Sequence, residues 1–402
     1  MINTTYYQDL TKMNTFGMKV KARCFMEYDS VADLVDIEFE ELARPVLHIG
    51  GGSNLLFTDD FKGTVLHSKI NFIEILQNGH GSGDHPHDPN TVLVSVGSGV
   101  VFDDFCAWAA KEGLWGVENL SYIPGEVGAS AVQNIGAYGV EVKDVIRKVY
   151  CYDTVEEEFV SFGVEECEYG YRDSIFKDPE VKGRYIVTHV VFALSRTPQP
   201  RLDYGHLRDA VMVSSVSPSS APRPATSSLT HPLRGGAMSL PDDTEEAMMS
   251  RLTPALIRKV IIKIRKEKLP EPSVMGSAGS FFKNPVITTE HFARIEAAAK
   301  AEHGPDYKVP HYVLETSIRH CEEQSDVAIC HMVKVPAAWL IEQCGWKGRR
   351  SGGAAVYDKQ PLVIVNYTGD AYPEEIVGLE RRIIASVKAK FDIDLHPEVE
   401  HI

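Results

Sequence analysis

The sequence predicts a mixed α/β (α+β) fold that is divided into several domains. The chain has 402 residues, which is more than one ordinary hydrophobic core accommodates. Segments with helical spacing of apolar residues alternate with short runs of β-branched and aromatic residues. Hydrophobic residues make up 44% of the chain and charged residues 24%, which is typical of a globular protein.

The first part of the chain alternates helix and strand. Apolar residues at helical spacing predict an amphipathic helix over residues 31–43, and residues 45–49 predict a short buried strand after it. Residues 91–96 predict another strand, and an apolar stripe that begins at Phe102 predicts a helix directly after it. This order indicates a small α/β unit.

Further elements follow in the second part of the chain. Residues 148–152 and 184–193 predict strands because they are rich in β-branched and aromatic residues. Thr253 suits a helix N-cap and Pro254 the first helical position, so a helix is expected from there until two prolines end it near residue 270. Apolar spacing from residue 376 to residue 387 predicts a long helix near the end.

The most informative segment comprises residues 122–138. It holds three glycines and no Lys, Arg or Asp. Such a segment lets the backbone approach a flat ring or a phosphate, and the amides of Gln133 and Asn134 add donors and acceptors. The alternative is a tight surface turn, but the segment is more apolar than solvated turns usually are. We predict a loop that holds a cofactor through its main chain.

A second glycine-rich segment, residues 49–54, follows the strand predicted at 45–49. A Rossmann fingerprint needs a further glycine three residues beyond Gly52 and then a helix. Leu55 occupies that position and begins an extended apolar run. The sequence therefore favours a glycine-rich turn whose amides bind a pyrophosphate without the Rossmann helix.

Six segments, taken in order, resemble the UDP-N-acetylenolpyruvoylglucosamine reductase family. They are residues 14–17, 49–54, 122–138, 171–177, 276–285 and 397–399. The resemblance covers nearly the whole chain. It implies two FAD-binding subdomains of the vanillyl-alcohol-oxidase type and a substrate-binding α+β domain. The three domains are expected at residues 1–70 (to which 390–402 return), 71–269 and 270–389.

The resemblance also implies the cofactors. FAD is expected to bind non-covalently, with its pyrophosphate at residues 50–54 and its flavin near residues 122–138, and NADPH is expected to be the reductant. The residues expected to contact FAD are Gly50, Gly51, Gly52, Ser53, Asn54, Ile123, Pro124, Gly125, Val127, Gly128, Ala129, Gln133, Asn134, Gly136, Ala137 and Tyr138.

The implied reaction reduces the enolpyruvyl group of UDP-N-acetylglucosamine enolpyruvate to give UDP-N-acetylmuramate for peptidoglycan synthesis. Three residues in separate motifs are the expected catalytic groups. Arg172 and a protonated Glu398 would stabilise charge on the substrate carboxylate, and Ser280 would give a proton to the adjacent carbon. Taken singly, each has an ordinary alternative: a surface ion pair, a turn residue or a solvated carboxylate.

Substrate contacts are expected from Tyr171, Tyr204, Lys268, Asn284 and Gln343, which match family positions. Tyr204 and Lys268 imply the longer subtype, in which a tyrosine-bearing loop closes over the substrate.

Two stretches depart from the family pattern. A Ser-rich segment at about 213–240 predicts a flexible surface insertion, and residues 313–331 are a second insertion. The second contains two adjacent His/Cys pairs, which invite a zinc interpretation, but adjacent ligands are poorly spaced for tetrahedral closure. We expect no metal.

Charge and composition limit the partners. A net charge of −15 argues against nucleic acid, and no apolar window is long enough to predict a membrane span. The start of the chain does not resemble a secretory signal, and seven scattered cysteines indicate reduced thiols, so we expect a cytoplasmic monomer. Two alternatives stay open: an FAD-dependent oxidase that uses oxygen, and a flavin- or nucleotide-sugar-binding protein whose insertions impair catalysis.

Overall fold

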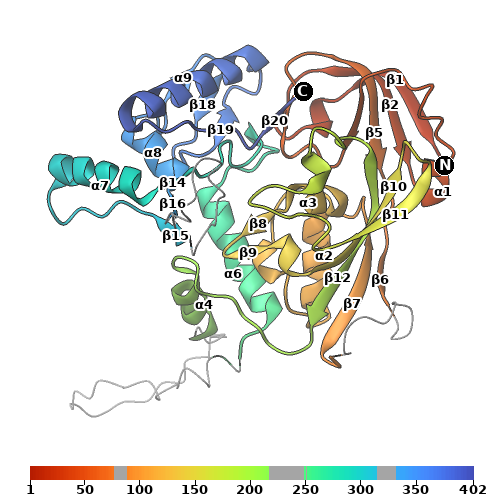
Figure 1. Ribbon diagram of the computed structural model, residues 1–402, viewed down its shortest axis with the longest axis horizontal. Coiled ribbons are helices and arrows are strands. Elements are labelled where there is room, and N and C mark those ends of the chain that lie inside the picture. Colours follow the sequence, from red (N-terminus) through yellow and green to blue (C-terminus); the bar gives the residue numbers. More distant parts are fainter. Residues whose placement is uncertain (77–87, 217–248, 250, 315–331) are drawn as a thin grey trace, which may run out of the picture.

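The computed structural model describes residues 1–76, 88–216, 249, 251–314 and 332–402. Its N-terminal sheet has the strand order β1-β2-β5-β3 (Figure 1). β1 (Asn3–Asp9) pairs antiparallel with β2 (Lys21–Tyr28), whereas β5 (Phe61–Ser68) runs parallel to both β2 and β3 (Val46–Ile49). The strand predicted at 45–49 is therefore confirmed.

The helix predicted over residues 31–43 is mostly wrong. α1 (Val31–Val35) has five residues, with the Ser30 hydroxyl accepting from the Asp33 N–H at its start. Ile37 and Phe39 are buried all the same, in a cluster that Tyr152 of the second sheet also joins. Their spacing reflects this packing against a sheet, and tertiary packing overrides the apparent helical period.

The second sheet has the order β11-β10-β12-β7-β6 and is antiparallel throughout. Its strands are β6 (Ile73–Ile75), β7 (Thr91–Gly97), β10 (Ile146–Asp153), β11 (Glu158–Gly163) and β12 (Tyr185–Ser195). The predicted strands at 91–96, 148–152 and 184–193 are confirmed. So is the helix from Phe102, which is α2 (Phe102–Lys111) and packs Phe105 against Phe192 of the sheet at 4.7 Å between ring centroids.

Two helices, α4 (Leu207–Val216) and α6 (Pro254–Lys268), share a core beside α2. The predicted cap is confirmed, since the Thr253 side chain accepts from the Leu256 N–H and Pro254 opens the helix. The Ser-rich segment expected from residue 213 begins within α4, because that helix continues to Val216. The rest of this prediction, from residue 217, lies outside the described residues.

The C-terminal region contains two small sheets with the orders β14-β16-β15 and β13-β19-β18-β17. Their strands are β13 (Gly276–Ser277), β14 (Val286–Thr288), β15 (Tyr312–Leu314), β16 (Met332–Lys334), β17 (Arg350–Ser351), β18 (Ala354–Val356) and β19 (Ile364–Asn366). The helices are α7 (Thr289–His303), α8 (Ala337–Gln343) and α9 (Pro373–Phe391), and α9 confirms the long helix predicted there. Short 3₁₀ helices occur at Thr11–Met13, Glu118–Leu120, Val142–Asp144 and Ile175–Lys177.

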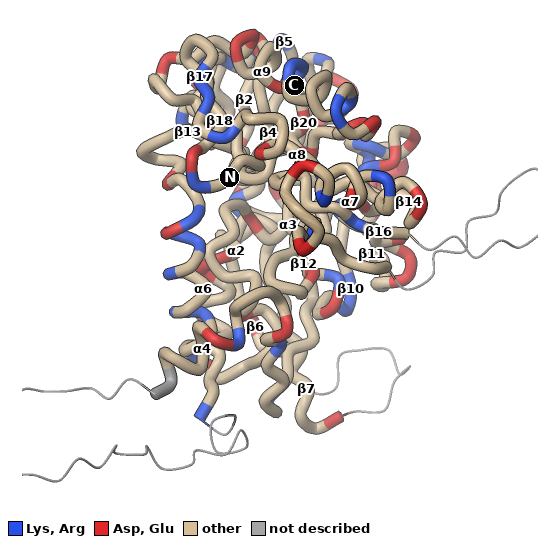
Figure 2. Tube along the Cα trace, turned by 90° about the vertical axis from the view of Figure 1, so that its left-hand side faces the viewer, with Lys and Arg blue, Asp and Glu red and all other residues tan. Residues whose placement is uncertain are grey.

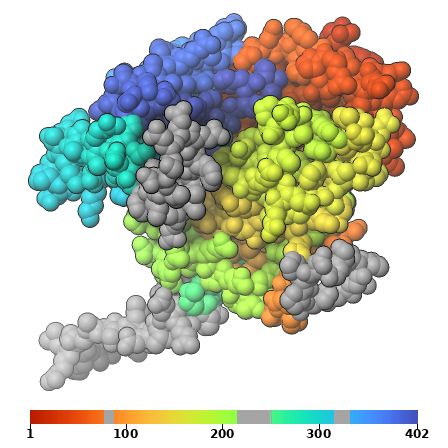
Figure 3. Space-filling view, viewed as in Figure 1, coloured from red at the N-terminus to blue at the C-terminus, as the bar shows by residue number. Residues whose placement is uncertain are grey.

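The two ends of the chain pack on each other. One buried cluster includes Phe16 from the N-terminal region and Phe281 and Ile383 from the C-terminal region, and Figure 3 shows the two regions side by side. The tail strand β20 (Glu400–His401) pairs in parallel with β4 (Leu55–Leu56). The tail therefore lies beside the strand that follows the first glycine-rich segment.

Other sequence-based expectations concern single features. No helix in the described part of the chain is long and apolar enough to cross a membrane. The cysteines for which side chains are described, Cys24, Cys106, Cys151, Cys167 and Cys344, are free. The His/Cys pairs of the second insertion lie outside the described residues.

Candidate active site

The two glycine-rich segments lie against each other. The Ser53 hydroxyl donates to the Pro124 carbonyl at 3.0 Å, so residues of the first segment contact the second directly. A Cβ added at Gly51 would lie 3.5 Å from the Gly125 Cα. Without side chains at these two positions, the main chains of the two segments pack directly on each other.

The sequence predicts a loop over residues 122–138, but only part of this segment is a loop. Its middle forms α3 (Val127–Gln133), which ends at Asn134 in the left-handed region with a φ of 46°. Gly128 brings this helix close to the second sheet, because a Cβ there would lie 2.9 Å from the Ser98 Cβ. The small residues thus serve close helix packing as well as exposure of main chain, and a helix this short leaves little periodicity to detect.

The residues present fit a bound flavin dinucleotide. In the described structure, the main-chain N–H groups of residues 51–54 donate to no other protein group, as expected where a diphosphate is bound by amides. Gly52 has a φ of 59°, and a Cβ there would overlap the Met13 carbonyl, so only glycine suits the turn. The Gln133 Nε2 is buried without an acceptor in the described structure, which leaves a donor for a ligand.

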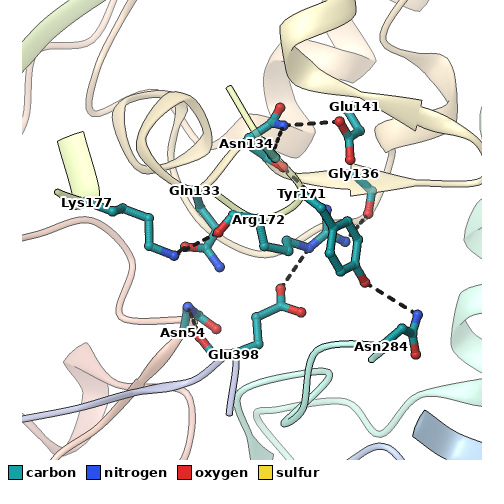
Figure 4. A network of polar contacts seen from close by, with 11 residues as sticks. Asn54, Gln133, Asn134, Gly136, Glu141, Tyr171, Arg172, Lys177, Asn284 and Glu398 are labelled. Atoms are coloured by element: carbon teal, nitrogen blue, oxygen red, sulfur yellow. Dashed lines mark hydrogen bonds and ion pairs between the residues drawn. The ribbon is translucent and has the colours of Figure 1, made fainter. Parts of the chain in front are cut away.

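Arg172 and Glu398 form an ion pair beside these segments (Figure 4). The Arg172 Nε donates to Glu398 Oε1 at 2.8 Å, and both side chains are mostly buried, with exposed fractions of 17% and 12%. The Arg172 Nη2 donates to the Gly136 carbonyl at 2.6 Å. Arg172 itself has a φ of 56°, a conformation that a non-glycine residue adopts at an energetic cost.

The segment that precedes the tail strand positions Glu398. Its N–H donates to the Phe281 carbonyl at 2.8 Å, and its carbonyl accepts from Asn54 Nδ2 at 3.0 Å. Ser280 immediately precedes Phe281, and Gly279, with a φ of 69°, makes the turn before it. The three predicted catalytic residues therefore come from three distant segments that meet in one region.

Three of the predicted substrate-binding residues lie next to this group. Asn284 Nδ2 donates to the Tyr171 hydroxyl at 3.4 Å, and burial raises the pKa of Tyr171. Tyr204 stacks on Tyr312 with 6.1 Å between ring centroids and meets Tyr138 edge-on at 6.0 Å. Figure 4 shows the Tyr171 ring beside Arg172, whose guanidinium carbon lies 5.4 Å from the ring centroid.

The other two predicted substrate-binding residues lie elsewhere. Lys268 is exposed in the last turn of α6, one of several basic residues on that helix (Figure 2). Gln343 accepts from the His303 ring at 3.2 Å and lines a cavity of about 340 Å³ that α7, α8 and α9 enclose. The structure therefore does not bring Gln343 into contact with Arg172 or Glu398.

Three basic residues near the site were not singled out from the sequence. Lys177 Nζ donates to Gln133 Oε1 at 2.8 Å, Arg265 Nε donates to the Tyr122 carbonyl at 3.1 Å, and Lys334 Nζ lies 4.5 Å from the Tyr171 ring centroid. Burial lowers the pKa of all three. Lys177 ends a segment that the resemblance already marked, and Arg265 lies one helical turn before Lys268. For Lys334 the sequence offers no comparable signal.

Comparisons with known proteins agree with this geometry. Residues 23–158 match the family described as "FAD binding domain". The two packed glycine-rich segments, residues 49–54 and 122–138, therefore form the cofactor cradle of a flavoprotein. Residues 271–402 match the family described as "UDP-N-acetylenolpyruvoylglucosamine reductase, C-terminal domain". The chain belongs to the UDP-N-acetylenolpyruvoylglucosamine reductase family.

Similar proteins are known over the full length of the chain. UDP-N-acetylenolpyruvoylglucosamine reductase of Bacteroides fragilis is 43% identical, with 98% of each chain covered. That of Porphyromonas gingivalis is 39% identical over 98% of this chain and 97% of its own. The crystal structure of the reductase from Thermus caldophilus superposes with a TM-score of 0.55 at 20% identity, covering 100% of this chain and 98% of that one, which shows a shared fold.

Proposed function

We propose that this chain reduces the enolpyruvyl group of UDP-N-acetylglucosamine enolpyruvate to UDP-N-acetylmuramate, with FAD as cofactor and NADPH as reductant. The reaction supplies a peptidoglycan precursor, and its place is the cytoplasm. The observation that carries the proposal is the Arg172–Glu398 pair, held at 2.8 Å beside two packed glycine-rich segments in a chain of this family. A guanidinium and a carboxyl at such a place suit a reaction that builds charge on a substrate carboxylate.

The glycine-rich segments hold the cofactor in this proposal. Main-chain N–H groups of residues 50–54 bind the diphosphate, and residues 123–138 lie against the ring system. FAD, when bound, accepts hydride from NADPH and donates it to the terminal alkene carbon. The protein excludes water from this region through the packing of the first segment, α3 and the tail.

Arg172 orients the substrate carboxylate through its planar fork. In this structure the guanidinium donates to Glu398 and to two carbonyl groups, which leaves one N–H on each of Nη1 and Nη2 for an arriving carboxylate. Glu398 then faces the same oxygens and, in its protonated form, donates to them. Ser280 gives its proton to the carbon next to the carboxylate.

Substrate binding is assigned to the tyrosines and amides around this group. Tyr171, Asn284 and Tyr204 contact the sugar-phosphate part, and Tyr204 lies on a loop that closes over it. Lys268 and Gln343 are also proposed as substrate contacts, although neither has a hydrogen bond or ion pair with Arg172 or Glu398 in the described structure. The proposed domains are residues 1–70 with 390–402, 71–269 and 270–389, with the site between them.

An anaerobic titration of the purified protein tests the proposal. The sample should be yellow, lose its colour with NADPH and regain it on addition of UDP-N-acetylglucosamine enolpyruvate. Rapid peroxide formation in air with no response to the sugar nucleotide would favour an oxidase instead. A yellow sample that neither substrate changes would indicate a binding protein without catalysis.

A further inference from the structure

A buried histidine, His67, lies between two carboxylates next to the glycine-rich segments. His67, on β5, is 3% exposed. Its Nδ1 lies 3.0 Å from Glu27 Oε1, and its Nε2 lies 3.0 Å from Glu126 Oε1. A neutral imidazole carries one N–H only, so two carboxylate partners require either an imidazolium or a protonated carboxyl.

The surroundings favour the imidazolium. Burial lowers the pKa of His67, but the hydrogen bond and charge of Glu126 and the hydrogen bond of Glu27 outweigh it, so the pKa is raised. The positive charge of Lys69, whose Nζ lies 3.9 Å from Glu27 Oε1, lowers the pKa of His67 but does not cancel this increase. On the neighbouring strand β3, burial and the charge of His67 lower the pKa of His48 to about 4. The His48 Nε2 forms a hydrogen bond with the Tyr28 hydroxyl at 2.7 Å.

Glu126 connects this histidine to the cofactor cradle. It is the N-cap residue of α3, yet its side chain makes no capping hydrogen bond and extends to His67 instead. Its other oxygen, Oε2, would lie 3.2 Å from a Cβ built on Gly50, so the carboxylate lies at the contact between the two glycine-rich segments. An uncompensated carboxylate there would repel a diphosphate.

We infer that His67 is a positioning residue of the dinucleotide cradle, whose imidazolium holds Glu126 in place and neutralises its charge. The inference rests on the proposed function only in taking FAD as the dinucleotide. His67 and its two carboxylates together carry one negative charge, whereas with a neutral imidazole they carry two. Because the imidazolium is the favourable form, FAD affinity is present at low pH and is lost as the pH rises through the raised pKa of His67.

The test is the Kd of FAD for the deflavinated protein between pH 6 and pH 9, measured by quenching of flavin fluorescence. The native protein should bind about tenfold more weakly at pH 9 than at pH 6. His67→Gln should lose about tenfold at pH 6 and show a flat profile. Glu126→Gln should flatten the profile without loss at pH 6, and should restore the affinity of His67→Gln when the two are combined.

The control is His189→Gln, which replaces a partly buried histidine that stacks on Tyr150 at 4.3 Å and has no carboxylate partner in the described structure. It should keep the native pH dependence. The inference is overturned if His67→Gln retains the native slope, or if the double variant binds FAD no more tightly than His67→Gln. If His67→Gln does not fold, Glu126→Gln decides alone, since a native slope in that variant is enough to reject the inference. Failure to bind FAD at any pH would instead reject the proposed function.

Discussion

Two arginine–carboxylate pairs in this protein differ in a way that separates structure from chemistry. Asp153 ends β10 and Arg184 immediately precedes β12, the neighbouring strand of the second sheet. The Arg184 guanidinium donates three hydrogen bonds to the Asp153 carboxylate at 2.6 to 2.9 Å. Arg172 and Glu398 are 226 residues apart and share a single hydrogen bond at 2.8 Å. The other donors of Arg172 go to the Asn134 and Gly136 carbonyls.

The difference shows which pair can accept a ligand. The Arg184 hydrogen bonds go to the one buried carboxylate of Asp153, with Glu156 3.6 Å from the same guanidinium, and they hold the pKa of Asp153 below its usual range. Arg172 divides its donors among the Glu398 carboxylate of the tail and two carbonyls of the second glycine-rich segment, those of Asn134 and Gly136. One of these can be replaced without dismantling a sheet, so this pair suits an anionic substrate.

The largest contrast is expected from the two arginines. Arg172→Lys keeps the charge but loses the fork, so kcat should fall about 10²–10³-fold with little change in thermal midpoint. Arg184→Lys should leave kcat within about twofold and lower the midpoint instead. Steady-state assays and thermal unfolding of both variants measure this, and equal losses of activity would remove the distinction.

A second variant displaces the guanidinium without touching it. A Cβ at Gly136 would lie 2.9 Å from Arg172 Nη1, so Gly136→Ala should lower kcat about tenfold or more because small misplacements at a reacting centre are costly. Gly163→Ala on β11 is the control, since its Cβ would come no closer than 3.4 Å, to a flexible Glu166 oxygen. Equal activity in the two variants would mean that Arg172 tolerates displacement.

Glu398→Gln keeps the shape of the side chain and one possible donor. We expect kcat to fall about tenfold, less than for Arg172→Lys, because the neutral amide can still donate to the substrate oxygens. Steady-state assays of this variant beside Arg172→Lys measure the difference. A loss of kcat as large as that of Arg172→Lys, or no loss, would contradict this expectation.

The smallest effect on activity is expected from Asp153→Asn. The lowered pKa of Asp153 means that the pair contributes stability above the ordinary carboxyl pKa and loses it as the pH falls through the lowered value. Asp153→Asn should therefore unfold more easily at neutral pH, and its stability should change less than that of the native protein below about pH 4. Denaturant unfolding at several acid pH values measures this. The expectation is contradicted if the free energy of unfolding falls by the same amount in the two proteins as the pH is lowered.

The sequence supports most of the fold, because long segments with clear periodicity, such as α2, α6 and α9, carry their own evidence. It fails where packing decides. The region of residues 31–43 has helical spacing but only five helical residues, and α3 is hidden by its small residues. Ser280, Arg172 and Glu398 were found because each lies in a family motif.

The contacts around those residues could not be predicted in the same way. Each of these contacts joins segments that are distant in the sequence and forms only on folding. Examples are the hydrogen bond from Arg172 to the Gly136 carbonyl, the contact of Lys334 with the Tyr171 ring, and the pairing of His67 with Glu27. The substrate contact of Gln343 stays a prediction. Its segment matches the family, and in this structure its side chain forms hydrogen bonds with His303 and Tyr307 and lines a cavity bordered by α7, α8 and α9.

The two half-reactions of Ser280→Ala test the central claim, which is that residues from distant segments act on one substrate at a bound flavin. Bleaching by NADPH should proceed at the native rate, while recovery of colour with the enolpyruvyl sugar nucleotide should slow by about 10³-fold or more. Ser386→Ala, which removes a hydroxyl bonded within α9, is the control and should leave both rates unchanged. Equal slowing of both half-reactions in Ser280→Ala, or no slowing of either, would contradict the account.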